Sequence, residues 1–180
     1  SARKALEEKY QVGFNNAENV QTSGDGTKKY LFKNTQGRFI EAAYIPEENR
    51  KTLCVSSQVG CKMGCEFCMT GRQKFHDQLS AAEIVNQLMS LPEFESVTNI
   101  VYMGMGEPMD NIDEMLRSLE ILTSDWGLGW SPKRITVSTI GVIPAMRRFL
   151  LESKCHLAIS LHSPFDEERK SFMPVQNKYP

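Results

Sequence analysis

The sequence predicts an α/β fold with a parallel sheet, and two observations carry this prediction. After a polar break at Pro46–Asn49, short apolar strand patterns alternate with amphipathic helix patterns, which is typical of βαβ units. The loops that follow these strands also hold the chain's most unusual residues. Because helices cover a parallel sheet, functional loops gather where its strands end. We therefore expect about four βα units with a site at that edge.

The residues before the break are predicted to form a separate N-terminal segment. We assign residues 1–46 to this segment and residues 47–180 to the core domain. A mobile lead-in with a short helix at Ala2–Tyr10 comes first. A β-hairpin follows, with strands at Lys29–Lys33 and Arg38–Ile45 joined through Asn34–Gly37.

The elements of the core follow in chain order. Strands are expected at Thr52–Ser56, Val97–Met103, Arg134–Thr139 and His156–Leu161. The helix at Ser80–Leu91 opens with a capping box formed by Ser80 and Glu83. The helix from about Asn111 to Thr123 repeats this cue, with Asn111 as the cap and Glu114 three residues on. Pro144 opens a third helix at a position that proline favours.

Composition narrows the class of protein. The net charge of −1 gives no overall attraction to nucleic acid or to a membrane. No stretch reaches the length of a membrane span, and the charged segment after Ser1 does not resemble a signal peptide. Three of the five cysteines lie within eight residues, which in a chain without a signal indicates metal binding in a reducing compartment. We expect a cytoplasmic protein.

The cysteine loop, residues 61–68, carries the strongest signal. Cys61, Cys65 and Cys68 have the spacing C-x3-C-x2-C, and clustered thiolates select zinc, Cu(I) or iron–sulfur clusters. A 4Fe–4S cubane takes one cysteine per iron, so three cysteines leave one iron open to a substrate or cofactor. The alternative is a structural zinc site with His76 as the fourth ligand. Such sites more often use a second cysteine pair, and Cys155 lies alone in a strand pattern.

This spacing after a first strand, with Phe67 before the last cysteine, resembles the radical S-adenosylmethionine (SAM) superfamily. The resemblance implies a 4Fe–4S cluster whose open iron binds the amino and carboxylate groups of SAM. It also implies a partial (β/α)6 barrel, of which four βα units are two-thirds. The run GMGEP at Gly104–Pro108 resembles the superfamily's GGE segment, with Met105 in place of a glycine. By itself this run could equally be an ordinary strand-to-helix turn.

Several longer segments resemble the family of adenine-C2 methyltransferases of 23S rRNA and tRNA. They are TLCVSSQVGCKMGCEFCMTG, VYMGMGEP, ITVSTIGVIPAM, LAISLHSPFDEER and MPVQNKY. The resemblance implies SAM contacts from Gly106, Glu107, Ser138, Ser160, Leu161 and His162. It makes Glu41 the acid/base residue and Cys54 the cysteine that helps resolve an RNA–enzyme covalent intermediate. Without the resemblance, Glu41 would be read as a solvated strand residue and Cys54 as a small core residue.

The family's chemistry starts from an electron-poor carbon, adenine C2, which cannot attack a SAM methyl group. The resemblance implies that one SAM methylates a cysteine and that a second generates the radical that activates this methyl group. In the family that cysteine, the last barrel strands and an asparagine SAM ligand lie beyond anything that matches here. We therefore expect these 180 residues to be incomplete for turnover.

The resemblance also predicts the partners. They are 23S rRNA and tRNA as substrates and an electron donor such as flavodoxin, with no membrane partner and a monomeric state. Two alternatives stay open. One is the sister activity that methylates adenine C8, and the other is a zinc-stabilised module that binds RNA or another partner.

Overall fold

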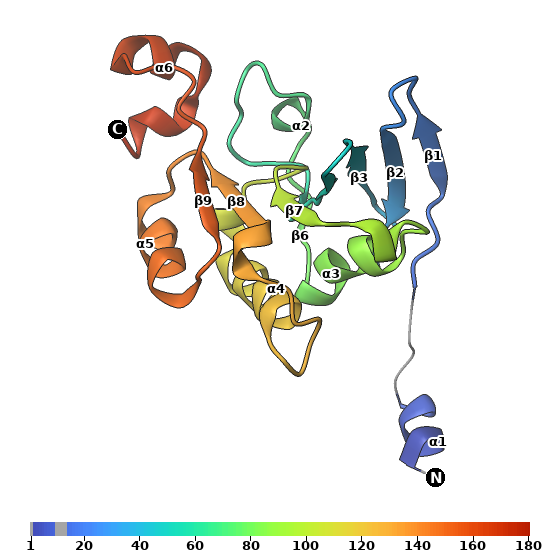
Figure 1. Cartoon of the computed structure of the whole chain (residues 1–180). Coiled ribbons are helices and arrows are strands. Elements are labelled where there is room, and N and C mark those ends of the chain that lie inside the picture. Colours follow the sequence, from blue (N-terminus) through green and yellow to red (C-terminus); the bar gives the residue numbers. More distant parts are fainter. Residues whose placement is uncertain (1, 10–13) are drawn as a thin grey trace.

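The computed structural model describes residues 2–9 and 14–180. Within these residues a mixed seven-stranded sheet forms one layer (Figure 1), with its strands in the order β1-β2-β3-β4-β7-β8-β9. Their bounds are β1 (Asn19–Thr22), β2 (Lys28–Lys33), β3 (Phe39–Pro46), β4 (Lys51–Cys54), β7 (Asn99–Tyr102), β8 (Ile135–Thr139) and β9 (His156–Ile159). Strands β1 to β4 pair antiparallel, whereas β4, β7, β8 and β9 pair parallel. The predicted α/β class with a parallel core sheet is confirmed.

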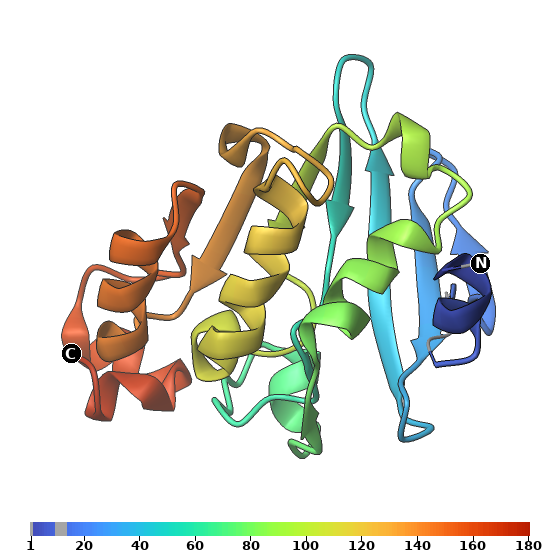
Figure 2. The ribbon, with the colours of Figure 1, turned by 90° about the horizontal axis from the view of Figure 1, so that it is seen from below.

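Three helices cover one face of the parallel strands, as Figure 2 shows. They are α3 (Ala81–Met89), α4 (Ile112–Thr123) and α5 (Ile143–Glu152). Their apolar sides pack on the sheet. Ile84 and Leu88 of α3 and Met115 of α4 are buried in one cluster with Leu53 of β4 and Ile100 of β7. None of the helices in the described part of the chain is long and apolar enough to cross a membrane.

The two predicted helix starts have different outcomes. The capping box of α3 is confirmed, because Ser80 and Glu83 exchange side-chain and backbone hydrogen bonds. At α4 Asn111 occupies the N-cap position as predicted, but its side chain makes no capping hydrogen bond. Its amide instead donates to the Ser57 and Leu79 carbonyl oxygens, since buried acceptors need a donor.

On the other face of the parallel strands no helix of the described residues packs, and this face carries several of the predicted site residues. Side chains alternate between the faces of a strand. Ala43 lies opposite Cys54, so Glu41, two residues before Ala43, shares the face of Cys54. The pairing continues through β7 to Thr136 of β8, and Ser138 is two residues further on. Glu41, Cys54 and Ser138 therefore face the helix-free side together.

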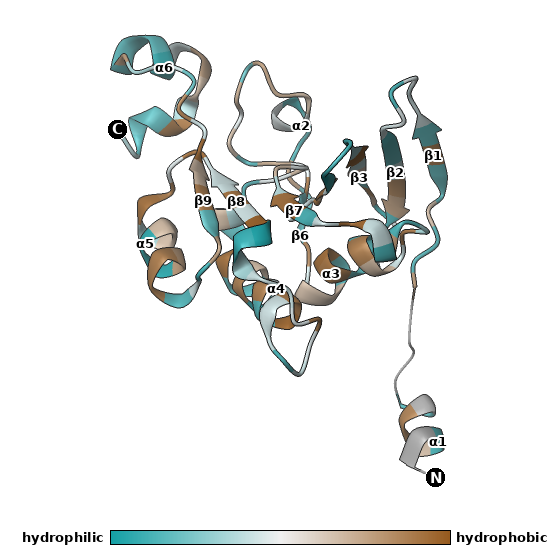
Figure 3. Ribbon diagram, viewed as in Figure 1, coloured by the Kyte–Doolittle hydropathy of each residue, from teal (hydrophilic) through white to brown (hydrophobic). Residues whose placement is uncertain are grey.

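The N-terminal part differs from the prediction in one strand. The expected helix is present as α1 (Ala2–Glu7), while Tyr10 lies outside the described residues. The prediction that Asn19–Thr22 belong to the lead-in is wrong. These residues form β1, which is exposed and drawn mainly in hydrophilic colours in Figure 3. It is held by backbone pairing to β2, which side-chain composition does not reveal. The division of the chain at residue 46 stays a prediction.

Candidate functional site

The loops after β4, β7, β8 and β9 meet at one edge of the sheet and enclose a cavity of about 270 Å³. Eight residues singled out by the sequence line this cavity. They are Cys61, Cys65, Cys68, Gly106, Glu107, Ser138, Ser160 and His162. Residues more than one hundred positions apart in the chain are thus brought to one place by the strand order.

The cysteine loop leaves the sheet through a small two-stranded ladder of β5 (Gln58–Val59) and β6 (Asp77–Gln78). It contains few backbone hydrogen bonds. Cys68 N donates to Cys65 O at 3.1 Å, and Glu66 N donates to Phe172 O at 3.0 Å. Cys65 is buried against Met173. The loop is therefore positioned at its ends and at one buried point.

Two of the three thiols, those of Cys61 and Cys65, favour the protonated form, so a metal must deprotonate them. Burial raises the pKa of Cys61 to about 11 and also raises the pKa of Cys65. Metal binding at neutral pH therefore releases protons. In the described residues no three His, Cys, Asp or Glu side chains converge closely enough to hold a single metal ion. Sulfurs that surround a cavity suit a cluster, in which each cysteine binds a different iron.

His76, the fourth ligand in the zinc alternative, does not line this cavity. Its side chain is exposed and its backbone N–H donates to Val59 O at 2.9 Å. Glu107 is the carboxylate that lines the cavity together with the thiols. Its oxygens already accept hydrogen bonds from backbone N–H groups.

The Gly-Glu loop, residues 103–107, requires both of its glycines. A Cβ atom at Gly104 would lie 2.7 Å from the Val55 carbonyl oxygen. Gly106 has φ +95° and a Cβ there would lie 2.5 Å from the Gln58 side chain. The loop thus runs in direct backbone contact with the segment that leads into the cysteine loop, which only glycine permits.

Ser56 fixes the middle of the Gly-Glu loop. Its hydroxyl accepts a hydrogen bond from Met105 N at 2.9 Å and donates to Glu41 O at 2.6 Å. The backbone of Ser56 is in turn held by the Gln87 amide of α3. Gln87 accepts from Ser56 N at 2.8 Å and donates to Ser56 O at 2.9 Å. A side chain of helix α3 thus makes the two backbone hydrogen bonds that a neighbouring strand would otherwise make.

Glu107 joins the Gly-Glu loop to the end of β8. Its side chain is only 4% exposed, and its carboxylate accepts from Met109 N and from Ile140 N, both at 3.1 Å. Burial raises the pKa of Glu107, although these hydrogen bonds act in the opposite direction. A carboxylate offers about four lone-pair sites, so it can still accept from an ammonium group in the cavity.

The ends of β8 and β9 form the far wall of the cavity. The hydroxyls of Ser138 and Ser160 lie 3.2 Å apart. His162 has φ +60°, which is uncommon outside glycine and typical of functional sites. Its ring contacts Phe67 of the cysteine loop, with 4.5 Å between ring centroids. A strained residue therefore connects this wall to the thiols.

Three predicted residues lie outside this cavity. Leu161 lines a neighbouring cavity. Glu41 is half-exposed and forms an ion pair with Lys29, with 3.0 Å between Oε1 and Nζ. Cys54 is partly buried, and burial raises its pKa. Glu41 and Cys54 lie on the helix-free face, beside the cavity rather than in it.

Sequence reasoning missed Thr139 and Ile140, which also line the cavity. Ile140 acts through its backbone N–H on Glu107, and a backbone donor leaves no signal in the side chain. The signal that could have found both is position, because they directly follow Ser138 at the end of a predicted strand.

Comparison with known proteins gives consistent results. Residues 55–179 match the model of the radical SAM superfamily. A probable dual-specificity RNA methyltransferase RlmN of Porphyromonas gingivalis is 61% identical over 178 residues, which are 99% of this chain and 52% of that protein. The dual-specificity RNA methyltransferase RlmN of Geobacter sulfurreducens is 47% identical, over 99% of this chain and 49% of that protein.

A solved structure shares the fold. The crystal structure of a radical SAM methyltransferase from Sphaerobacter thermophilus superimposes with a TM-score of 0.93 at 36% sequence identity. The match covers 99% of this chain and 55% of that one. The chain spans about half the length of the curated relatives that it matches.

Proposed function

Because this chain belongs to the radical SAM superfamily, we propose that Cys61, Cys65 and Cys68 hold a 4Fe–4S cluster beside a SAM site. The observation that carries the proposal is the single cavity lined by all three thiols and by the Gly-Glu loop. Bound together, the two groups would supply carbon-radical chemistry. The residues of this chain bind and orient them and limit the access of water.

Each residue predicted to contact SAM has a part in this proposal. Glu107, with Gly106, would accept hydrogen bonds from the ammonium group of SAM, since a buried carboxylate binds a cation strongly. Ser138 and Ser160 offer hydroxyls that can donate or accept. His162 would form the wall against the rest of the cofactor, and the adjacent Leu161, which lines the neighbouring cavity, would contact the cofactor from the edge of this wall. The chain's buried hydrogen bonds hold these groups in place before a ligand arrives.

The proposed reaction is methylation of C2 of an adenine in 23S rRNA and in tRNA. It is supported by relatives named dual-specificity RNA methyltransferase at 47–61% identity and by the neighbour described as a radical SAM methyltransferase. Adenine C2 is electron-poor, and this explains why a methyl transfer to it needs a radical. We assign this reaction to the full-length protein.

Glu41 and Cys54 are proposed to act on the RNA rather than on SAM. Both lie on the helix-free face next to the cavity, where a nucleotide could approach. Glu41 would move the proton at the reacting carbon, after exchanging its ion pair with Lys29. Cys54, as a thiol with a raised pKa, would help release the RNA from its covalent intermediate.

The proposal includes the remaining partners and boundaries. An electron donor such as flavodoxin would supply the electrons, and the protein would act as a monomer in the cytoplasm, where both RNAs are found. We also propose that residues 1–46 form a segment distinct from the core of residues 47–180.

The test uses the full-length protein, reconstituted anaerobically with iron and sulfide. Dithionite, labelled SAM and an rRNA fragment or tRNA are added, and the RNA is digested. Labelled 2-methyladenosine from the wild type, and none from Cys68→Ala, is the expected result. A loaded cluster without methylated RNA, or a product methylated at C8, contradicts the proposed reaction. One tightly bound zinc per chain in place of iron contradicts the proposed cluster.

A further inference from the structure

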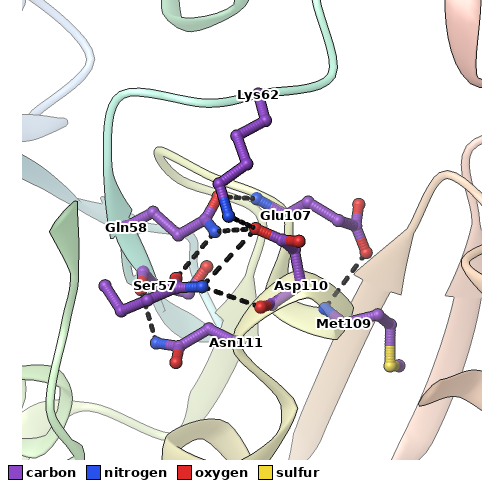
Figure 4. A network of polar contacts seen from close by, with 8 residues as sticks. Ser57, Gln58, Lys62, Glu107, Met109, Asp110 and Asn111 are labelled. Atoms are coloured by element: carbon purple, nitrogen blue, oxygen red, sulfur yellow. Dashed lines mark hydrogen bonds and ion pairs between the residues drawn. The ribbon is translucent and has the colours of Figure 1, made fainter. Parts of the chain in front are cut away.

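We propose that Asp110 is a positioning residue that fixes the cysteine loop and the Gly-Glu loop relative to each other. The inference rests on the function proposed above and concerns a residue that lies outside the cavity. Asp110 belongs to η2 (Pro108–Asn111), the turn that directly follows Glu107. Figure 4 shows its carboxylate at the centre of a polar network that joins both loops.

One oxygen of Asp110 contacts both sides of the site. Its Oδ2 accepts from Lys62 Nζ at 2.9 Å and from Gln58 Nε2 at 2.8 Å. Lys62 directly follows Cys61 in the cysteine loop, and its ammonium also lies over the Phe75 ring, 4.2 Å from the centroid. The cysteine loop is therefore tethered by a charge pair as well as by its ends.

The contact with Gln58 reaches the Gly-Glu loop. Gln58 is fully buried, and its Oε1 accepts from Glu107 N at 2.8 Å. Its Nε2 donates to Asp110 and to Gln78 Oε1, the latter at 2.7 Å. A rotated amide would place Gln58 oxygen against two acceptors and its NH2 group against the Glu107 N–H. Asp110, together with Gln78 Oε1, thus sets the direction of the Gln58 amide, and this amide sets the position of Glu107.

The two contacts predict separable effects. Asp110→Ala removes both, so SAM affinity should fall about tenfold, the size of one hydrogen bond to a charged group. Asp110→Asn keeps an oxygen that can accept from Gln58. Because a neutral hydrogen bond is about half as strong as a charged one, the SAM affinity of this variant should fall only about threefold. Lys62→Met removes the half-exposed charge pair and the contact of the ammonium with the Phe75 ring but leaves Gln58 bonded to Asp110. Loss of iron to a chelator should therefore be about threefold faster while SAM affinity is kept.

The experiment uses reconstituted full-length protein under anaerobic conditions. SAM affinity is measured by calorimetry, and the electron paramagnetic resonance spectrum of the reduced cluster is recorded with and without SAM. Far-ultraviolet circular dichroism checks folding. The matched control is Asp113→Ala, which removes an exposed carboxylate of α4 that pairs with Arg148 and contacts neither loop.

The inference is supported if affinity falls in the order wild type and Asp113→Ala, then Asp110→Asn, then Asp110→Ala, with a changed SAM-dependent spectrum for Asp110→Ala. It is overturned if the SAM affinity of Asp110→Ala lies within about twofold of the wild-type value, or if Asp113→Ala loses as much SAM affinity as Asp110→Ala. Should Asp110→Ala not fold, the threefold loss in Asp110→Asn decides alone, and an unchanged affinity overturns the inference. A wild type that binds neither cluster nor SAM refutes the proposed function itself.

Discussion

The cysteine loop and the Gly-Glu loop leave neighbouring strands at the same edge of the sheet, but the protein holds them in different ways. The Gly-Glu loop is fixed by buried hydrogen bonds that its backbone N–H groups donate to Ser56 and Gln58. In the cysteine loop Phe67 is 53% exposed and the adjoining Met69 is 70% exposed. One loop is held by buried hydrogen bonds, whereas the other exposes large apolar side chains beside its thiols.

The largest expected effect breaks the cysteine loop. Cys61→Ala, Cys65→Ala or Cys68→Ala should each abolish cluster assembly, because three ligands leave no spare thiol. Cys155→Ala is the control, since Cys155 lies directly before β9, away from the cavity. Iron and sulfide are measured per chain after anaerobic reconstitution. A Cys155 variant that loses its iron, beside a Cys68 variant that retains it, would refute the ligand assignment.

The next effect breaks the support of the Gly-Glu loop. Gln87→Leu keeps the size of the side chain but leaves Ser56 N and Ser56 O without partners in a buried place. The free energy of unfolding should fall by about 3 kcal/mol, since each buried unsatisfied group costs 1–3 kcal/mol. Urea unfolding of the cluster-free protein measures it, and Gln36→Leu on an exposed loop is the control. Equal stabilities of the two variants would contradict the prediction.

A third experiment separates the two loops by function. Glu107→Ala should weaken SAM binding by about 1.5–3 kcal/mol, the value of a hydrogen bond to a charged group, while the iron content is unchanged. Glu66→Ala, which removes a carboxylate from the exposed cysteine loop, should bind SAM normally. Calorimetry on reconstituted protein provides the measurement. An unaltered affinity in the Glu107 variant would remove Glu107 from the SAM site.

The smallest effect is a pH dependence of the cysteine loop. Folding favours the neutral Cys61 thiol, so this contribution to stability is present below its ordinary pKa of 9.0 and is lost as pH rises through about 11. In cluster-free protein, labelling of Cys61 by iodoacetamide should therefore accelerate about tenfold per pH unit between about pH 7 and 10. Peptide mass spectrometry follows the rate. A rate that levels off near neutral pH would show that the thiol is already ionised.

The sequence predicted more of the cavity than of its surroundings. Cysteine spacing and the two glycines are local patterns, and the strand–helix alternation places their loops at one edge. Asn111 is the N-cap residue as predicted but makes no capping bond, because buried acceptors elsewhere in the fold bind its amide. Strand β1 was missed because backbone pairing alone holds it. Contacts that depend on distant carbonyls and backbone N–H groups leave no periodic signal in the sequence.

The close backbone contact at Gly104 predicts which inherited substitutions this codon can accept. Its backbone passes so close to the Val55 carbonyl that any Cβ atom collides, and every other amino acid carries one. Missense changes at this codon are therefore excluded whatever the charge or polarity of the new residue. In a library of random variants under selection for the folded chain, this position should keep glycine alone, while the exposed Met103 beside it accepts many replacements.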